Sequence, residues 1–383
     1  MRISSITKNA GKACNNRLYR HIRTFEKIVK NYFVICNKIF IIGLLAVTGL
    51  MLLYFGLVEV SEERAVVDGS VYSGYEAVQM NRKITEEFEG ELTDEKAEQI
   101  IKKYGLPSKL EENMPGWRDG NFLNDFVTRY FTDGAWETGT IPTRRYMLCE
   151  TELGKACDKT GKIPYLAYTT GWKVFVEMLQ FGFVLGSIWL ICGVSGIFAE
   201  ESQIKMLPVI FCTKEGRRKD VFAKILAAFT FTLIIFLWIV LIDFVLCQKI
   251  YGLQGTDNIA WMVLSDYIRQ PLMFLQYLGI LLGLGFQAFL SLCAMLLCIS
   301  AYQNSSFGAV VIAAVCWGFP VLLRMFFGGL MAVIVDAMPI FLIMTLAVND
   351  IYMIWYVVSG INFCIAIGCL VKGTIFYKKR FLH

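Results

Sequence analysis

The fold of this chain is decided by the stretch FVICNKIFIIGLLAVTGLMLLYFGLV, residues 33–58. Its only charged residue is Lys38, and an apolar run of this length is long enough to cross a lipid bilayer as a helix. No small-residue cleavage pattern follows the run. We therefore expect 33–58 to be a retained membrane helix and not a cleaved signal peptide.

Five further apolar stretches follow the first along the chain. They lie at 173–198, 221–247, 272–300, 307–323 and 349–371. Hydrophobic residues make up 56% of the 383 residues, and the mean hydropathy is +0.53. A soluble protein of this length keeps a more polar surface than such a composition allows. The sequence therefore predicts an all-α polytopic membrane protein with six transmembrane helices, the first at 33–58 and the other five within 171–383.

Basic residues set the expected orientation in the membrane. Lys and Arg side chains gather in the N-terminal lead, in the segment 199–219 and at the C-terminus. Under the positive-inside rule all three regions face the cytoplasm, and six crossings do place all three on one side. We therefore expect a multi-pass protein of the bacterial plasma membrane, with both termini cytoplasmic and the 248–270 loop outside.

The N-terminal lead, residues 1–32, carries eight Lys or Arg side chains and one acidic residue. Apolar residues recur at helical spacing between Leu18 and Phe33. This pattern predicts an amphipathic helix that lies on the cytoplasmic membrane surface and leads into the first span. A solvated basic tail is the alternative.

The insert between the first and second spans, residues 59–170, has the opposite charge balance. It carries 21 Asp or Glu residues against 14 Lys or Arg, whereas the whole chain has a net charge of +5. Its length of about 110 residues is that of a domain. Thr93 followed by two acidic residues predicts a helix start, and Gly105 predicts its end. We therefore expect a large extracytoplasmic domain between helices 1 and 2.

The insert contains two cysteines, Cys149 and Cys157. In an oxidising compartment outside the cell they could form a disulfide that closes a short loop. Spacing alone does not fix the geometry of a bridge, so two free thiols are the alternative.

The stretch 324–348 is apolar but interrupted by charge, glycine and proline. A seventh full crossing there would place the basic C-terminus outside the cell, against the positive-inside rule. We therefore expect short re-entrant helices before helix 6. Broken backbone at membrane depth is tolerated where protein or a cavity covers it, which makes Arg324 and Asp336 candidate pathway-lining residues.

The sequence shows no motif for catalysis or cofactor binding. It lacks the glycine-rich phosphate loop, His-Glu-x-x-His, Gly-x-Ser-x-Gly and Cys-x-x-Cys. The basic clusters flank the spans, where orientation explains them, so no nucleic-acid surface is expected. Glu177, Asp243 and Arg324 lie near the outer ends of their apolar runs, where water is close, which gives an intramembrane enzyme little support. We expect no catalytic residue, no metal and no cofactor.

The segment 199–219 is too charged for lipid and too apolar for a plain loop. It opens on Glu200 and Glu201, continues through the apolar cluster 206–211, and ends on Arg217 and Arg218. This pattern favours a short amphipathic helix that packs on the membrane face or docks on a partner. An ordinary positive-inside loop is the alternative.

At these residues the chain resembles the membrane permeases of type-2 (ABC-2) exporters. In that family the second span ends in an acidic turn, an Arg element precedes a Lys that opens the third span, and a Ser-x-x-x-Asn element follows the fourth. The matching residues are Glu200-Glu201, Gly216-Arg217, Ala223-Lys224, Ser300 and Asn304. The chain departs from the family at Gln203-Ile204-Lys205, where Gly-Thr is common, and its large insert carries no family motif.

The resemblance implies a division of labour between subunits. The chain would be the permease subunit of an exporter, ATP would be hydrolysed on a separate cytoplasmic ATP-binding subunit, and a second permease chain would complete a homo- or heterodimer in the lipid bilayer. The segment 199–219 would couple to the ATP-binding subunit. Its candidate coupling residues are Glu200, Glu201, Leu207, Phe211, Arg217 and Arg218. The alternative is a membrane-anchored sensor or immunity protein whose outer domain binds a ligand or peptide.

Overall fold

The computed structural model describes residues 40–106, 120–134, 142–205, 219–264, 272–326, 335, 338 and 352–379. The predicted interfacial helix of the N-terminal lead and most of the stretch 324–348 lie outside these residues. The same holds for several candidate site residues, namely Leu207, Phe211, Arg217, Arg218 and Asp336.

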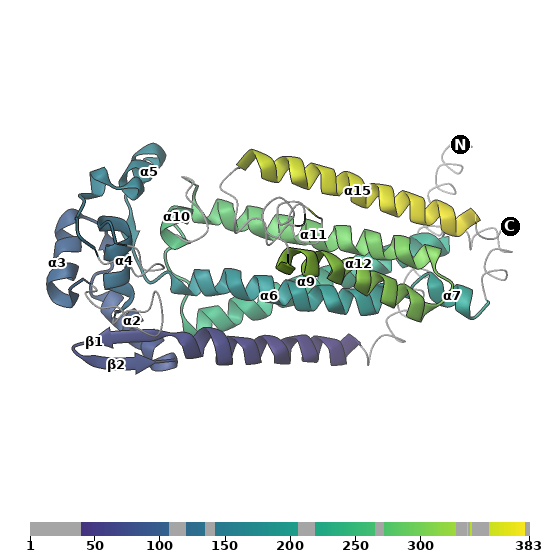
Figure 1. Ribbon diagram of the computed structural model, residues 1–383, viewed down its shortest axis with the longest axis horizontal. Coiled ribbons are helices and arrows are strands. Elements are labelled where there is room, and N and C mark those ends of the chain that lie inside the picture. The colour runs from purple at the N-terminus through teal and green to yellow at the C-terminus, as the bar shows by residue number, and fades with distance from the viewer. Residues whose placement is uncertain are drawn as a thin grey trace, which may run out of the picture.

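Long helices form a bundle along the longest axis of the molecule (Figure 1). Their bounds are Phe40–Val60 for the first helix, which ends in the π-helical turn η1 (Phe55–Val60), then α6 (Thr170–Val194), α9 (Val221–Ile250), α11 (Phe274–Tyr302), α12 (Ser306–Phe326) and α15 (Tyr352–Lys379). The short helix α7 (Ala199–Gln203) follows α6 at one end of the bundle. Buried apolar side chains of these helices form one continuous core.

Five of these helices are long and apolar enough to cross a membrane: the first helix, α6 with α7, α9, α11 and α15. In α12 the apolar part is shorter, Ser306–Pro320, and Pro320 lies inside the helix. The chain is thus a mostly helical protein with the spans of a multi-pass membrane protein. A sixth crossing through α12 stays a prediction, as do the re-entrant helices after it.

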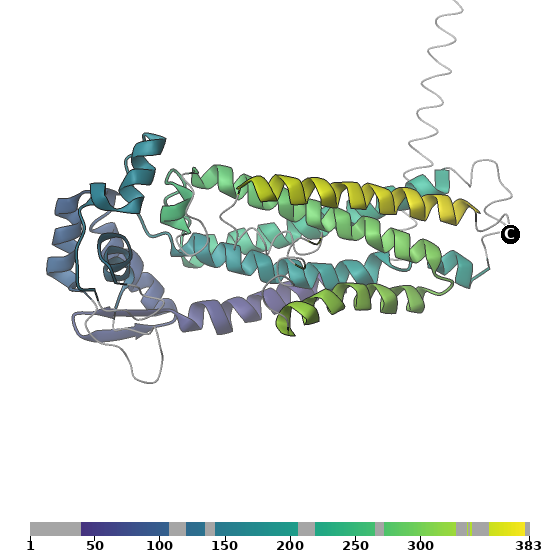
Figure 2. The same cartoon turned by 45° about the horizontal axis from the view of Figure 1, so that its top comes forward.

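The residues between the first helix and α6 form a compact unit, here called the head, at one end of the bundle (Figures 1 and 2). Its elements are β1 (Arg64–Val67), β2 (Ser70–Ser73), α2 (Tyr75–Glu86), β3 (Gly90–Glu91), α3 (Asp94–Tyr104), α4 (Phe122–Phe131), η2 (Leu148–Glu150), α5 (Glu152–Thr160) and β4 (Tyr165–Leu166). Antiparallel pairs β1–β2 and β3–β4 add two small two-stranded sheets to the head, within a chain that is mostly helical as predicted. The first pair turns through Asp68 and Gly69, both at positive φ, as Asp-Gly hairpins do.

Local sequence signals account for the helix that we expected after Thr93. The Thr93 side chain accepts a hydrogen bond from Lys96 N at 3.2 Å, which caps the start of α3. The helix ends at Gly105, whose φ of 72° favours glycine. The predicted helix between these two residues is therefore confirmed.

Two glycines allow α6 and α9 to approach closely. A Cβ atom added to Gly182 would lie 2.5 Å from Ile239 Cγ2, and one added to Gly186 would lie 2.6 Å from Ile239 Cδ1. The two glycines are four residues apart and so lie on the same face of α6. Small residues at this spacing are typical of tightly packed membrane helices.

The loop after α9 fastens the head to the bundle. Asn258 donates a hydrogen bond from Nδ2 to Tyr165 O at 2.8 Å and accepts one from Tyr165 N at 3.1 Å. Ile259, together with Met262 of the short helix α10 (Ala260–Val263), is buried in the core of the head. This loop, expected only as an outer connection, therefore serves as a structural bridge.

Candidate functional site

The end of the bundle away from the head contains a buried ion pair between the α7 acidic turn and α9. Lys224 of α9 is 4% exposed, and its ammonium pairs with Glu201 and, at 2.9 Å, with Asp220. The Tyr377 hydroxyl of α15 hydrogen-bonds the Glu201 carboxylate and lies 3.4 Å from Lys224 Nζ. A buried ammonium is stable only with such partners, so the arrangement fixes α7 to α9 and α15.

The backbone around α7 is tied to two further helices. Ser300 Oγ of α11 accepts hydrogen bonds from the amides of Phe198, at 2.9 Å, and Ala199, at 3.2 Å. Gln203 Oε1 accepts one from the amide of Ser306, at the start of α12, at 3.0 Å. Four helices therefore meet at α7, and Glu201, Ser300, Lys224, Asp220 and Tyr377 are here called the α7 cluster.

The α7 cluster brings together motif residues that are far apart in the sequence. Glu201, Lys224 and Ser300 all belong to the elements that carry the family resemblance. Glu201 is 16% exposed and directs its carboxylate to Lys224 within the chain, whereas its neighbour Glu200 is exposed. Of the two predicted coupling acids, only Glu200 presents its side chain to the surface.

Sequence reasoning missed two members of the α7 cluster. A lysine in the first turn of an apolar span needs polar partners. Asp220 lies four residues before Lys224, a spacing at which two side chains of a helix meet, so the sequence indicated this ion pair. The role of Tyr377 had no such signal, because it depends on the packing of the last helix against α7.

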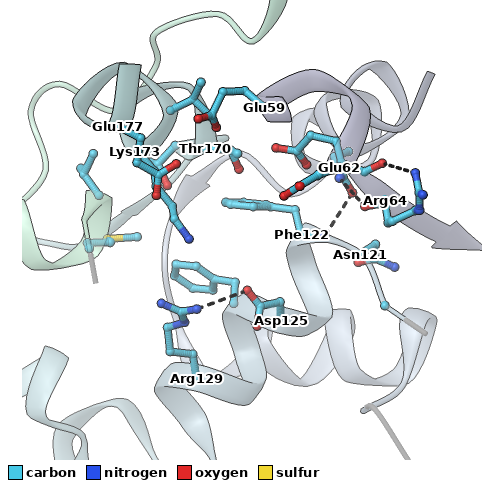
Figure 3. A pocket seen from close by; sticks show the side chains of 18 of the residues that line it. Glu59, Glu62, Arg64, Asn121, Phe122, Asp125, Arg129, Thr170, Lys173 and Glu177 are labelled. Carbon is cyan, nitrogen blue, oxygen red and sulfur yellow. Dashed lines mark hydrogen bonds and ion pairs between the residues drawn. The ribbon is translucent and has the colours of Figure 1, made fainter. Parts of the chain in front are cut away.

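A second candidate site is a cavity of about 520 Å³ between the head and the near ends of the first helix and α6 (Figure 3). Its charged lining residues are Glu59, Glu62, Glu63, Arg64, Asp125, Arg129, Lys173 and Glu177, and aromatic residues of α4 line it as well. Both the head and the bundle contribute lining residues, so the cavity depends on the contact between these two parts.

Side-chain amides position α4 against this cavity. Asn121 caps the helix by accepting hydrogen bonds from the amides of Leu123 and Asn124, both at 3.1 Å. Asn81 of α2 donates to Arg64 O at 3.2 Å and accepts from the amide of Phe122 at 3.1 Å. These contacts hold the start of α4 beside β1, which directs its lining side chains into the cavity.

Burial controls the electrostatics of the cavity at Glu63. Removal from water raises the pKa of the Glu63 carboxyl to about 7, and nearby Glu177 also raises it. Lys173 and a hydrogen bond with Tyr251 act in the opposite direction. Arg129 forms an ion pair with Asp125 on α4 at 3.7 Å (Figure 3). Glu63 therefore titrates near neutral pH.

The predicted disulfide is absent from the structure, in which Cys149 and Cys157 are free thiols. Cys157 lies on the buried face of α5 with Leu153 and Ala156, whereas Cys149 is exposed on η2. The two side chains thus face different environments, which explains why the short sequence spacing does not produce a bridge.

The three charges expected near water have different surroundings. Asp243 of α9 is fully buried, and Cys247, one turn later, donates a hydrogen bond to it at 3.4 Å, so the expectation of a surface-proximal carboxylate is wrong there. Glu177 lines the cavity. Arg324 lies in the last turn of α12. Among the residues that the structure describes, no group of His, Cys, Asp or Glu side chains is arranged to hold a metal ion.

Comparisons of the chain with known protein families, with curated proteins and with solved structures find no match.

Proposed function

We propose that the chain is the permease subunit of an ATP-driven exporter in the bacterial plasma membrane. A cytoplasmic ATP-binding subunit would supply energy, and a second permease chain would complete the pathway through the bilayer. In this arrangement both termini and the α7 end of the bundle face the cytoplasm, and the head lies outside. The chain itself would hydrolyse no ATP.

The α7 cluster is the observation that carries this proposal. A permease driven from outside its own chain needs a place where force applied to one surface element reaches several membrane helices. The turn at α7 is bonded to α9 and α15 through Lys224 and Tyr377, and to α11 through Ser300. A partner that moves the segment 199–219 would therefore move all of these helices together.

Within this proposal the two acids of the turn have separate roles. Glu201 would hold the turn in place, and exposed Glu200 would face the ATP-binding subunit. Leu207 and Phe211 would supply the apolar anchor of the interface, since buried apolar groups carry most of such contacts and rim charges set orientation. Arg217 and Arg218 would pair with acidic groups or lipid phosphates.

Purification of the tagged full-length chain from its native membranes tests the proposal. We expect an ATP-binding protein to co-purify and the eluate to hydrolyse ATP. The Leu207→Ser, Phe211→Ser double variant should lose both, whereas Lys249→Glu, at the exposed opposite end of α9, should retain both. An eluate from the native chain without ATP hydrolysis and without a nucleotide-binding partner would contradict the proposal.

A second candidate function is a sensor or immunity protein. The cavity between head and bundle favours it, because a ligand bound there would contact both parts at once. In that case the native chain should bind its ligand without any nucleotide-binding partner.

A further inference from the structure

The part of the cavity nearest the bundle has a surplus of acidic groups. Glu59 at the end of the first helix and Glu177 of α6 line this part (Figure 3). Glu63, just after the first helix, also lines the cavity. Glu59 and Glu177 interact directly through their side chains. Like charges so close repel one another unless a cation or a proton lies between them.

The lining as a whole carries five acidic side chains against three basic ones, namely Glu59, Glu62, Glu63, Asp125 and Glu177 against Arg64, Arg129 and Lys173. Lys173 of α6 acts on Glu63. Arg64 is exposed and donates to the carbonyls of Ser61, at 3.1 Å, and Glu63, at 3.2 Å. Arg129 is engaged with Asp125 on the opposite side of the cavity. With all three Glu side chains ionised, a bound cation would therefore gain favourable electrostatic energy.

The rest of the lining suits an organic cation. Phe122, Phe126 and Tyr130 of α4 line the cavity. Aromatic faces attract ammonium groups and also pack against methylene chains. The volume of about 520 Å³ lies within the range of small-molecule sites.

We propose that this cavity binds a ligand that carries at least two alkylammonium groups. One ammonium lies between Glu59 and Glu177, a second lies by Glu63, and the connecting methylene chain packs on Phe122. Linear diamines and lysine-bearing peptides are two sources of this chemistry. The inference depends on the cavity alone and would hold for an exporter and for a sensor.

Isothermal titration of the purified full-length chain in detergent at pH 8 tests the proposal. The probes are trilysine, 1,5-diaminopentane, and trilysine with every amine acetylated. We expect one or both amines to bind and the acetylated peptide not to bind. Tighter binding of trilysine identifies a peptide as the source, and equal or tighter binding of the diamine identifies a small amine. Binding by neither amine, or equal binding of the acetylated peptide, would overturn the proposal.

Matched variants separate the cavity from general surface charge. The Glu59→Gln, Glu177→Gln double variant should weaken amine binding by about tenfold or more. Glu95→Gln with Glu98→Gln makes the same charge change on the exposed face of α3 and should leave binding unchanged. Equal weakening in both double variants would mean that the amines bind to surface charge in general.

The Lys173→Met variant tests whether weaker binding in the Glu variants could result from misfolding. Removal of the competing ammonium should tighten amine binding by about threefold or more, a gain that a damaged protein would not show. Weaker binding in this variant would contradict the assignment of the acidic subsite.

Discussion

Lys224 is the buried cation on which the α7 end of the bundle depends. Its side chain is 4% exposed and has Glu201, Asp220 and Tyr377 as partners. Phe198 and Tyr377 also place their rings 5.7 Å and 5.5 Å from its ammonium, within cation–π range. One side chain thus links three parts of the chain: the α7 turn, α9 and α15.

The first prediction concerns this residue. Lys224→Met removes the ammonium and leaves the carboxylates of Glu201 and Asp220 in a partly buried site, so we expect a loss of stability of about 2–4 kcal/mol. Thermal unfolding of the purified protein in detergent measures it. Lys249→Met, at an exposed position of the same helix, is the control and should change the midpoint little. Equal midpoints for both variants would mean that the ion pair contributes no stability.

Glu63 carries a prediction on pH. Its folded-state pKa of about 7 is above the ordinary value of 4.5, so the folded protein holds this proton more tightly than the unfolded chain. The protonated Glu63 carboxyl therefore makes its full contribution to the free energy of unfolding below pH 4.5. This contribution is lost as the pH rises through 7. The groups that act on Glu63 are Lys173, Glu177 and Tyr251.

Glu63→Gln removes this titration. At pH 8 we expect the variant to be more stable than the native protein by roughly 1–3 kcal/mol, because the native carboxylate is then ionised in a partly buried site. Near pH 4 the two proteins should unfold at similar temperatures. Glu62→Gln, at an exposed neighbouring position, should follow the native pH profile. A constant difference across pH would exclude the assigned titration.

At the scale of elements, close packing of α6 against α9 sets the centre of the bundle. Gly182→Ala should force the two helices apart, because the new Cβ would lie 2.5 Å from Ile239 Cγ2. We expect a loss of about 1–3 kcal/mol in thermal unfolding. The double variant Gly182→Ala, Ile239→Ala should recover part of the lost stability. Gly279→Ala is the control and should change stability little, because no atom lies within 4 Å of the added Cβ. A variant at Gly182 as stable as the native chain would contradict this packing.

Element positions were largely predictable and element contacts were not. Long apolar runs located α6, α9 and α11 within a few residues, since a membrane helix needs a continuous apolar stretch. The pair Asp68-Gly69 is typical of two-residue hairpin turns, and the β1–β2 hairpin was not among the predicted elements. The candidate sites were predicted less well, because Lys224, Tyr377 and Asn121 act through partners distant in sequence, and local patterns do not encode such contacts.

At the scale of the whole molecule, the head and α7 lie at opposite ends of the bundle (Figures 1 and 2). If the bundle crosses the membrane, these ends face opposite compartments. A cysteine at Ser70 of β2 should then react with a membrane-impermeant reagent in intact cells, whereas one at Glu200 should react only after lysis. Both positions are exposed, and the background should lack native exposed cysteines such as Cys149. Reaction at Glu200 alone in intact cells would reverse the orientation.

The Lys224–Tyr377 contact has a consequence for biosynthesis. The two residues are 153 positions apart, and Tyr377 lies near the end of the last helix. At ordinary rates of translation the ribosome needs roughly 8–30 s to cover that distance. Until Tyr377 is synthesised, Lys224 lacks this partner. A chain that stops before α15 would lack Tyr377 and would leave the buried Lys224 ammonium without one of its polar partners.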